Sequence, residues 1–165
     1  MRRHVAVAAV AVALGVKLAV DTLPDCVVAI GFMRPAAWFA ANCLGAAFDP
    51  SSLTISARAV TLSVVRACSA TDFFSMVFAL LAFAMPIRQL ALRLPAVVVL
   101  AWFAAVLANS VRLVLLVCVD GFFPASHIPV VHMTIGIAVF LPVFAVLWYT
   151  FVIRKGVPHG NIAAG

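Results

Sequence analysis

Acidic side chains are scarce in this sequence, which holds no glutamate and only five aspartates among its 165 residues. Glycosidases and aspartyl proteases work with a pair of neighbouring carboxylates, and five aspartates leave few candidates for such a pair. We therefore do not expect carboxylate-pair chemistry.

Metal-binding patterns of cysteine and histidine are also missing. The four cysteines form no Cys-x-x-Cys pair and no spacing of the zinc type. One looser grouping, made of Cys118, Asp120, His127 and His132, is an alternative, but its spacing matches no common metal site. The sequence predicts neither a bound metal nor another cofactor.

Charged residues make up only 10% of the chain, whereas 67% of the residues are hydrophobic and the mean hydropathy is +1.24. These values exclude an ordinary soluble domain and indicate an integral membrane protein. The net charge of +6 comes from Lys and Arg residues that stand singly or in pairs at the ends of apolar runs. Such charges typically set membrane topology, so we expect no nucleic-acid partner.

Four apolar runs are long enough to cross a bilayer, which takes about 20 residues. They cover residues 4–20, 69–85, 95–119 and 131–153. A fifth run, residues 35–48, is shorter and suits an interfacial or re-entrant helix. We therefore predict an all-α polytopic membrane helix bundle with about four spans. It forms one domain over residues 1–155, followed by a short cytoplasmic tail at 156–165.

Positive charges predict the orientation of these spans. Short basic segments lie at the N-terminus, between the second and third spans, and after the last span. With four spans all three segments lie on one side, which the positive-inside rule identifies as the cytoplasm. The same parity puts the five aspartates at the outer face, although Arg34, Arg58 and Arg66 then lie outside as well. A further crossing at residues 35–48 would break this parity.

The N-terminal run resembles a signal peptide, because Arg2 and Arg3 precede an apolar stretch. Lys17 and the lack of a small-residue cleavage site favour a retained anchor instead. The even number of cysteines permits a disulfide, and Cys26 with Cys43 is the one pairing that we consider. A free cysteine serves equally well as a small buried hydrophobic residue.

One arginine lies inside an apolar run, because Arg112 is about seven residues from the outer end of the third span. An ionised side chain at that depth is costly and is a functional hypothesis by default. Asn109 lies one helical turn earlier on the same face, and both side chains are expected to face a cavity. The guanidinium either stabilises a developing oxyanion there, or snorkels outward or pairs with an aspartate such as Asp72.

Two other reactive side chains flank the neighbouring spans. Cys68 directly precedes the second apolar run, where a helix N-terminus and nearby Arg66 favour the nucleophilic thiolate while burial in hydrocarbon opposes it. His132 opens the last span, with His127 in the preceding loop and Gly136 one turn below. A thiol nucleophile needs a base, and histidine titrates closest to neutral pH.

Each of these residues also has an ordinary structural explanation: a buried cysteine, a snorkelling arginine and an interfacial histidine. The four-span topology nevertheless puts Cys68, Arg112 and His132 together in the outer third of the membrane. That convergence predicts thiol chemistry at the outer face. Two alternatives stay open: a small transporter or channel subunit with an anion site at Arg112, and a structural partner protein without activity.

The motifs that carry these residues resemble those of the exosortases and archaeosortases. Residues 67–70, Ala-Cys-Ser-Ala, resemble their Ala-Cys-Ser-Gly motif, and residues 108–112, Ala-Asn-Ser-Val-Arg, resemble their Ala-Asn-x-x-Arg motif. His132 with Gly136 is similar to their histidine element. Order and spacing agree across about residues 60–150.

The resemblance implies a membrane-embedded cysteine protease or transpeptidase of the bacterial cytoplasmic (inner) membrane, with its site facing outward. Its substrates would be exported proteins that end in a short recognition motif, a transmembrane helix and a basic tail. Cys68 would be the nucleophile, Arg112 the stabiliser of the oxyanion or thiolate, and His132 the acid and base. Two departures accompany the resemblance: Ala70 replaces the usual glycine, and the chain, much shorter than the typical eight-span member, resembles the compact exosortases.

Overall fold

The computed structural model of the chain describes residues 2–57, 60–66, 69–85, 87–120, 122 and 128–153. Its elements in chain order are α1 (Arg2–Asp21), α2 (Asp25–Val28), the π-helical turn η1 (Ala29–Met33), α3 (Arg34–Leu44), β1 (Ala47–Asp49), β2 (Thr54–Ala57), β3 (Val60–Ser63), α4 (Thr71–Phe83), α5 (Ile87–Val119), α6 (Ile128–Trp148) and the π-helical turn η4 (Tyr149–Ile153). The predicted helical membrane bundle is therefore confirmed in its main feature, and a small sheet is added to it.

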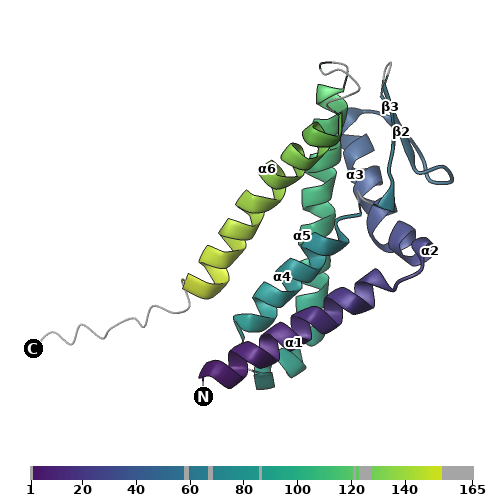
Figure 1. Cartoon of the computed structure of the whole chain (residues 1–165). Helices are drawn as coiled ribbons and strands as arrows, with labels where there is room; N and C mark the ends of the chain where they lie inside the picture. Colours follow the sequence, from purple (N-terminus) through teal and green to yellow (C-terminus); the bar gives the residue numbers. More distant parts are fainter. Residues whose placement is uncertain are drawn as a thin grey trace, which may run out of the picture.

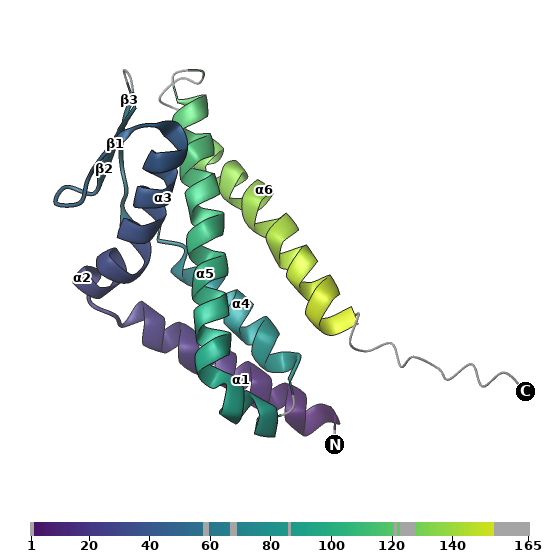
Figure 2. The same ribbon diagram turned by 180° about the vertical axis from the view of Figure 1, so that it is seen from behind.

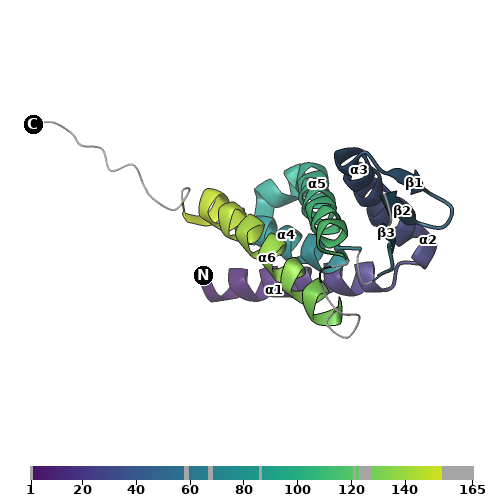
Figure 3. The ribbon, with the colours of Figure 1, turned by 90° about the horizontal axis from the view of Figure 1, so that it is seen from above.

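Helix α5 is the central element of the bundle. It contacts α3, α4 and α6, while α1 packs along α4 (Figure 1). Figure 3, which looks down on α5, shows the other helices arranged around it. Helix α3 packs on α5 through small side chains, which let the two backbones approach closely. These are the buried alanines Ala36, Ala37, Ala40 and Ala41.

Three helices of the described chain are long and apolar enough to cross a membrane: Asp25–Leu44, Leu92–Val119 and Pro129–Phe151. The last two agree with the third and fourth predicted spans. The first predicted span is the 20-residue helix α1, but the second is α4, which has only 13 residues. A helix of that length is shorter than the about 20 residues that the hydrocarbon core requires. The total of four crossings stays a prediction.

We predicted a separate short helix at residues 35–48, and this prediction is wrong. The chain is helical from Asp25 to Leu44, and Phe48 already belongs to β1. Pro35 does not interrupt this helix, although it has no N–H to donate to the Gly31 carbonyl one turn earlier. That carbonyl lies in η1 and accepts a hydrogen bond of 2.6 Å from the Trp102 indole of α5. A tertiary contact thus replaces the helical bond that proline cannot make.

An antiparallel sheet of three strands, in the order β1-β2-β3, lies beside α3 and was not predicted. Phe48, Ile55 and Leu62 are paired across it, and Ile55 is fully buried against the helices. Asp49 fixes the turn after β1 by accepting hydrogen bonds from Ser51 and Ser52, which lower the pKa of its carboxyl to about 2.

The bundle has two distinguishable ends (Figures 1 and 2). The N-terminal ends of α1 and α5 and the C-terminal ends of α4 and α6 lie toward one end. The sheet, the C-terminal end of α5 and the N-terminal end of α6 lie toward the other. Helix α1 and the helix Asp25–Leu44 follow one another along this direction instead of doubling back. The helix ends that adjoin the three basic segments, which we predicted to lie on one side of the membrane, therefore still lie toward one end of the bundle, although Asp25–Leu44 is an additional helix.

Candidate active site

A cavity of about 400 Å³ lies between the N-terminal end of α4, the outer part of α5 and the first turns of α6. Arg112 of α5 and His132 of α6 both line it. The structure thus brings two of the three predicted site residues into one cavity. Of the other sequence candidates, Cys68 and His127 lie outside the described residues.

The described residues on either side of Cys68 also line this cavity. Before it, Arg66 accepts on its carbonyl a hydrogen bond of 2.9 Å from the Ser69 N–H. After it, the Ser69 and Thr71 hydroxyls are hydrogen-bonded at 3.1 Å, and Thr71 is the first residue of α4. Helix α4 thus begins three residues after Cys68 in the sequence, and the placement of the Cys68 thiol at its N-terminus stays a prediction.

Ala70 has a left-handed backbone conformation, with φ 57° and ψ 19°. A residue with a Cβ loses about 1–2 kcal/mol in this region, whereas glycine adopts it freely. The resemblance placed a glycine at this position, and the backbone explains that preference. Alanine nevertheless adopts this conformation here, and Ala70 is buried in the hydrophobic cluster that also contains Val20 and Phe73.

Arg112 is seated against one face of α6. Its Cζ lies 5.9 Å from the centre of the Phe140 ring, and a Cβ added to Gly136 would lie 3.5 Å from its Nε. A Cβ there would be in ordinary van der Waals contact with the guanidinium, so α6 lies directly beside it at Gly136, and Phe140 offers its electron-rich face. Phe140 in turn stacks on Phe73 of α4, with ring centres 4.5 Å apart. Arg112 thus connects α5, α6 and α4 at the cavity.

One donor of Arg112, its Nε–H, is available for an anion. Its Nε is buried and has no hydrogen-bond partner within the part of the chain that the structure describes. The alternative pairing with Asp72 is not formed, because the Asp72 carboxylate lies 2.8 Å from the Lys17 ammonium instead. A buried donor left without a partner is costly, which favours a site where an acceptor arrives with the ligand.

Asn109 does not share the cavity, although it precedes Arg112 by one turn. Its side chain is fully buried inside the bundle and does not line the pocket. Two residues three positions apart on a helix differ by about 60° in direction, which follows from 3.6 residues per turn. That difference lets Arg112 reach the cavity while Asn109 packs behind it. Our prediction that both side chains face a cavity holds for Arg112 alone.

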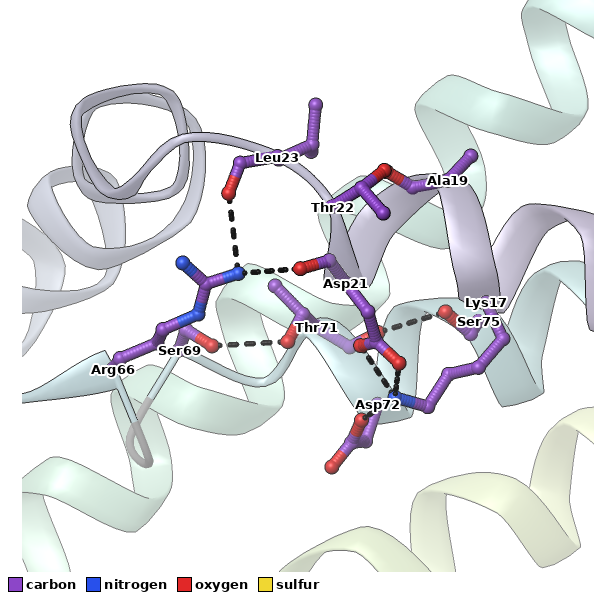
Figure 4. A network of polar contacts seen from close by, with 10 residues as sticks. All are labelled: Lys17, Ala19, Asp21, Thr22, Leu23, Arg66, Ser69, Thr71, Asp72 and Ser75. Atoms are coloured by element: carbon purple, nitrogen blue, oxygen red, sulfur yellow. Dashed lines mark hydrogen bonds and ion pairs between the residues drawn. The ribbon is translucent and has the colours of Figure 1, made fainter.

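Arg66 has a role that its closeness to Cys68 in the sequence did not reveal. Its guanidinium forms an ion pair with Asp25. It also donates to the carbonyls of Asp21 and Leu23, at 3.0 and 3.2 Å (Figure 4). Its charge is therefore largely compensated by the connection between α1 and α2. Sequence reasoning also missed the ion pair of Lys17 with Asp72, which lies on a different helix.

The remaining cysteines contribute no second site. Cys26, Cys43 and Cys118 are free and exposed. Cys26 and Cys43 lie near opposite ends of one helix, about 25 Å apart at 1.5 Å per residue, so the disulfide that we considered is not formed. Among the described residues, no group of three His, Cys or Asp side chains is placed to hold a metal ion.

Comparison with known proteins identifies one family. The family model described as transmembrane exosortase (Exosortase_EpsH) matches residues 2–149, which include all three motifs at the cavity. No curated protein and no solved structure matches the chain.

Proposed function

We propose that this chain, which belongs to the transmembrane exosortase family, is a membrane-embedded cysteine protease or transpeptidase. Its substrates are exported proteins that end in a short recognition motif, a transmembrane helix and a basic tail. It cleaves them at the outer face of the bacterial cytoplasmic membrane. The reaction uses no cofactor, because the thiol, the guanidinium and the imidazole supply the groups that acyl transfer requires.

One observation carries the proposal. Arg112 and His132, which come from different helices, line one cavity with the residues that flank Cys68. A buried Arg112 Nε without a partner among the described residues adds a donor that suits a transient anion.

The proposed reaction has two steps. The Cys68 thiolate attacks the scissile carbonyl, and Arg112 stabilises the oxyanion of the tetrahedral intermediate. The C–N bond then breaks as His132 donates a proton to the leaving amine, which leaves a thioester on Cys68. In the second step His132 accepts a proton from water or an acceptor amine, which attacks the thioester and restores the thiol. Water gives hydrolysis, and an amine gives transpeptidation.

The proposal is tested by cleavage of an exported reporter that carries such a C-terminal signal. We expect Cys68→Ser to lower processing by about 10³-fold or more, because it removes the nucleophile. Cys26→Ser, Cys43→Ser and Cys118→Ser are matched controls that keep wild-type processing. Processing that survives in Cys68→Ser contradicts the proposal, because another nucleophile then cleaves the reporter. A wild-type chain that does not process the reporter leaves Arg112 as an anion site of a transporter or of a protein without activity.

A further inference from the structure

We infer that Lys17 of α1 is a positioning residue of the cysteine site, holding the start of α4 through Asp72. The inference rests on the proposed function and extends it to a helix none of whose described side chains lines the cavity. Lys17 therefore acts through Asp72 and does not contact the substrate.

The described residues that flank Cys68 contact the end of α1 and the connection that follows it (Figure 4). Two positions before Cys68, Arg66 binds Asp25 and the carbonyls of Asp21 and Leu23. Four positions after it, Asp72 binds Lys17 at 2.8 Å. Arg66 and Asp72 are thus both held by residues of α1 or of the connection that follows it.

Lys17 is itself held in place by its own helix. Its ammonium lies 2.5 and 2.6 Å from the two Asp21 carboxylate oxygens, one helical turn further on. The ammonium therefore bridges Asp21 and Asp72. A lysine fixed by one carboxylate offers the other a stationary partner, so the first turn of α4 has a defined position against α1.

These ion pairs contribute little to folding, because the side chains are substantially exposed: Lys17 at 39%, Asp21 at 46% and Asp72 at 78%. Exposed pairs add little to the stability of a fold. Apolar packing holds α1 on α4 instead, through a buried cluster that includes Val20, Phe73 and Val77. Removing the Lys17 charge should therefore leave the protein folded while releasing Asp72.

A released Asp72 carboxylate would disfavour a thiolate at the cavity that it lines. The charged or titratable groups that line this cavity are Arg66 before α4, Asp72 on α4, Arg112 on α5 and His132 on α6. Asp72 is the one acid among these described groups, and Lys17, which also pairs with Asp21, offsets part of its charge. Lys17 therefore affects both the position and the electrostatic environment of Cys68.

The test uses a protein whose only cysteine is Cys68, made with Cys26→Ser, Cys43→Ser and Cys118→Ser in native membranes. We expect Lys17→Met to raise the pH midpoint of Cys68 alkylation by about one unit and to lower reporter cleavage about tenfold, at an unchanged melting temperature. Lys17→Arg should keep the wild-type midpoint. Lys17→Met combined with Asp72→Asn should restore it, because the unpaired carboxylate is gone. Lys155→Met is the matched control, since it removes the chain's other lysine.

An unchanged midpoint and unchanged cleavage in Lys17→Met overturn the inference, as does a loss of activity that follows a loss of folded protein. Failure of the proposed function looks different. In that case Cys68→Ser still cleaves the reporter, whatever Lys17→Met does to the midpoint.

Discussion

At the scale of single residues, Arg112 is the side chain whose surroundings depart most from an ordinary structural role. A structural arginine inside a membrane protein normally pairs with an acid or with carbonyls. Arg112 instead lies against Gly136 and Phe140, and its Nε has no partner among the described residues. These contacts position the planar guanidinium and leave its Nε donor for another group, which is what oxyanion stabilisation requires.

Replacing Arg112 by lysine separates a catalytic role from a structural one. Lysine keeps the positive charge but loses the planar fork of donors. We expect Arg112→Lys to leave protein level and melting temperature near wild type while processing falls by about 10²-fold, the scale of losing one oxyanion donor. Quantitative blotting of the cleaved reporter and thermal unfolding in detergent measure the two effects. Normal processing in Arg112→Lys would leave only the structural role.

At the scale of elements, the start of α4 combines backbone strain with burial at Ala70. Replacing it with glycine relieves about 1–2 kcal/mol of left-handed strain. The same change removes a buried methyl worth about 0.8 kcal/mol and adds about 0.5–1 kcal/mol of backbone entropy cost. These terms nearly cancel, which explains how alanine is tolerated at a position that suits glycine.

The free energy of unfolding of Ala70→Gly should therefore lie within about 1 kcal/mol of the wild-type value, and the variant should keep its processing activity. Ala70→Val is the contrasting variant, because a β-branched residue adopts positive φ with much greater strain. We expect it to be clearly destabilised in chemical unfolding. A wild-type stability for Ala70→Val would show that the left-handed conformation is not maintained.

The elements that the sequence predicted are those whose signals are local. Long apolar runs predicted α5 and α6, and the cost of charge in a membrane singled out Arg112. The helix Asp25–Leu44 was missed because its continuity through Pro35 depends on the Trp102 indole, 71 residues away in the chain. The sheet was missed because its strands are three or four residues long, too short for a clear alternation. Lys17 was missed because the sequence contains no local sign that it pairs with Asp72.

At the scale of the whole molecule, the pairing of basic residues bears on the orientation in the membrane. Arg66 and Lys17 lie in the part of the chain that the predicted topology puts near the outer face, where basic residues are disfavoured. Both are paired with aspartates, Arg66 with Asp25 and Lys17 with Asp21 and Asp72. Because these charges are paired, they contribute little to the predicted orientation, which the basic segments at the opposite end of the bundle determine.

The arrangement of the bundle makes the topology testable at three points. The sheet lies at the same end as the C-terminal end of α5, and the N-terminal end of α5 lies at the other (Figure 1). Reporter fusions after residues 58 and 121 should therefore give the same outer signal, and a fusion after Arg93 should give the cytoplasmic one. The positive-inside rule gives the direction, because the N-terminal end of α5 carries Arg88 and Arg93.

The fusion after residue 58 is the decisive one, because it reports whether Asp25–Leu44 adds a crossing of its own. If α1 and this helix cross the membrane in succession as one passage, positions 58 and 121 share a side, and the Cys68 segment approaches the cavity from the outer face. Opposite signals at 58 and 121 would mean that the helix crosses separately. The sheet and the outer end of α5 could not then share one side, and the outward-facing site would lose its basis.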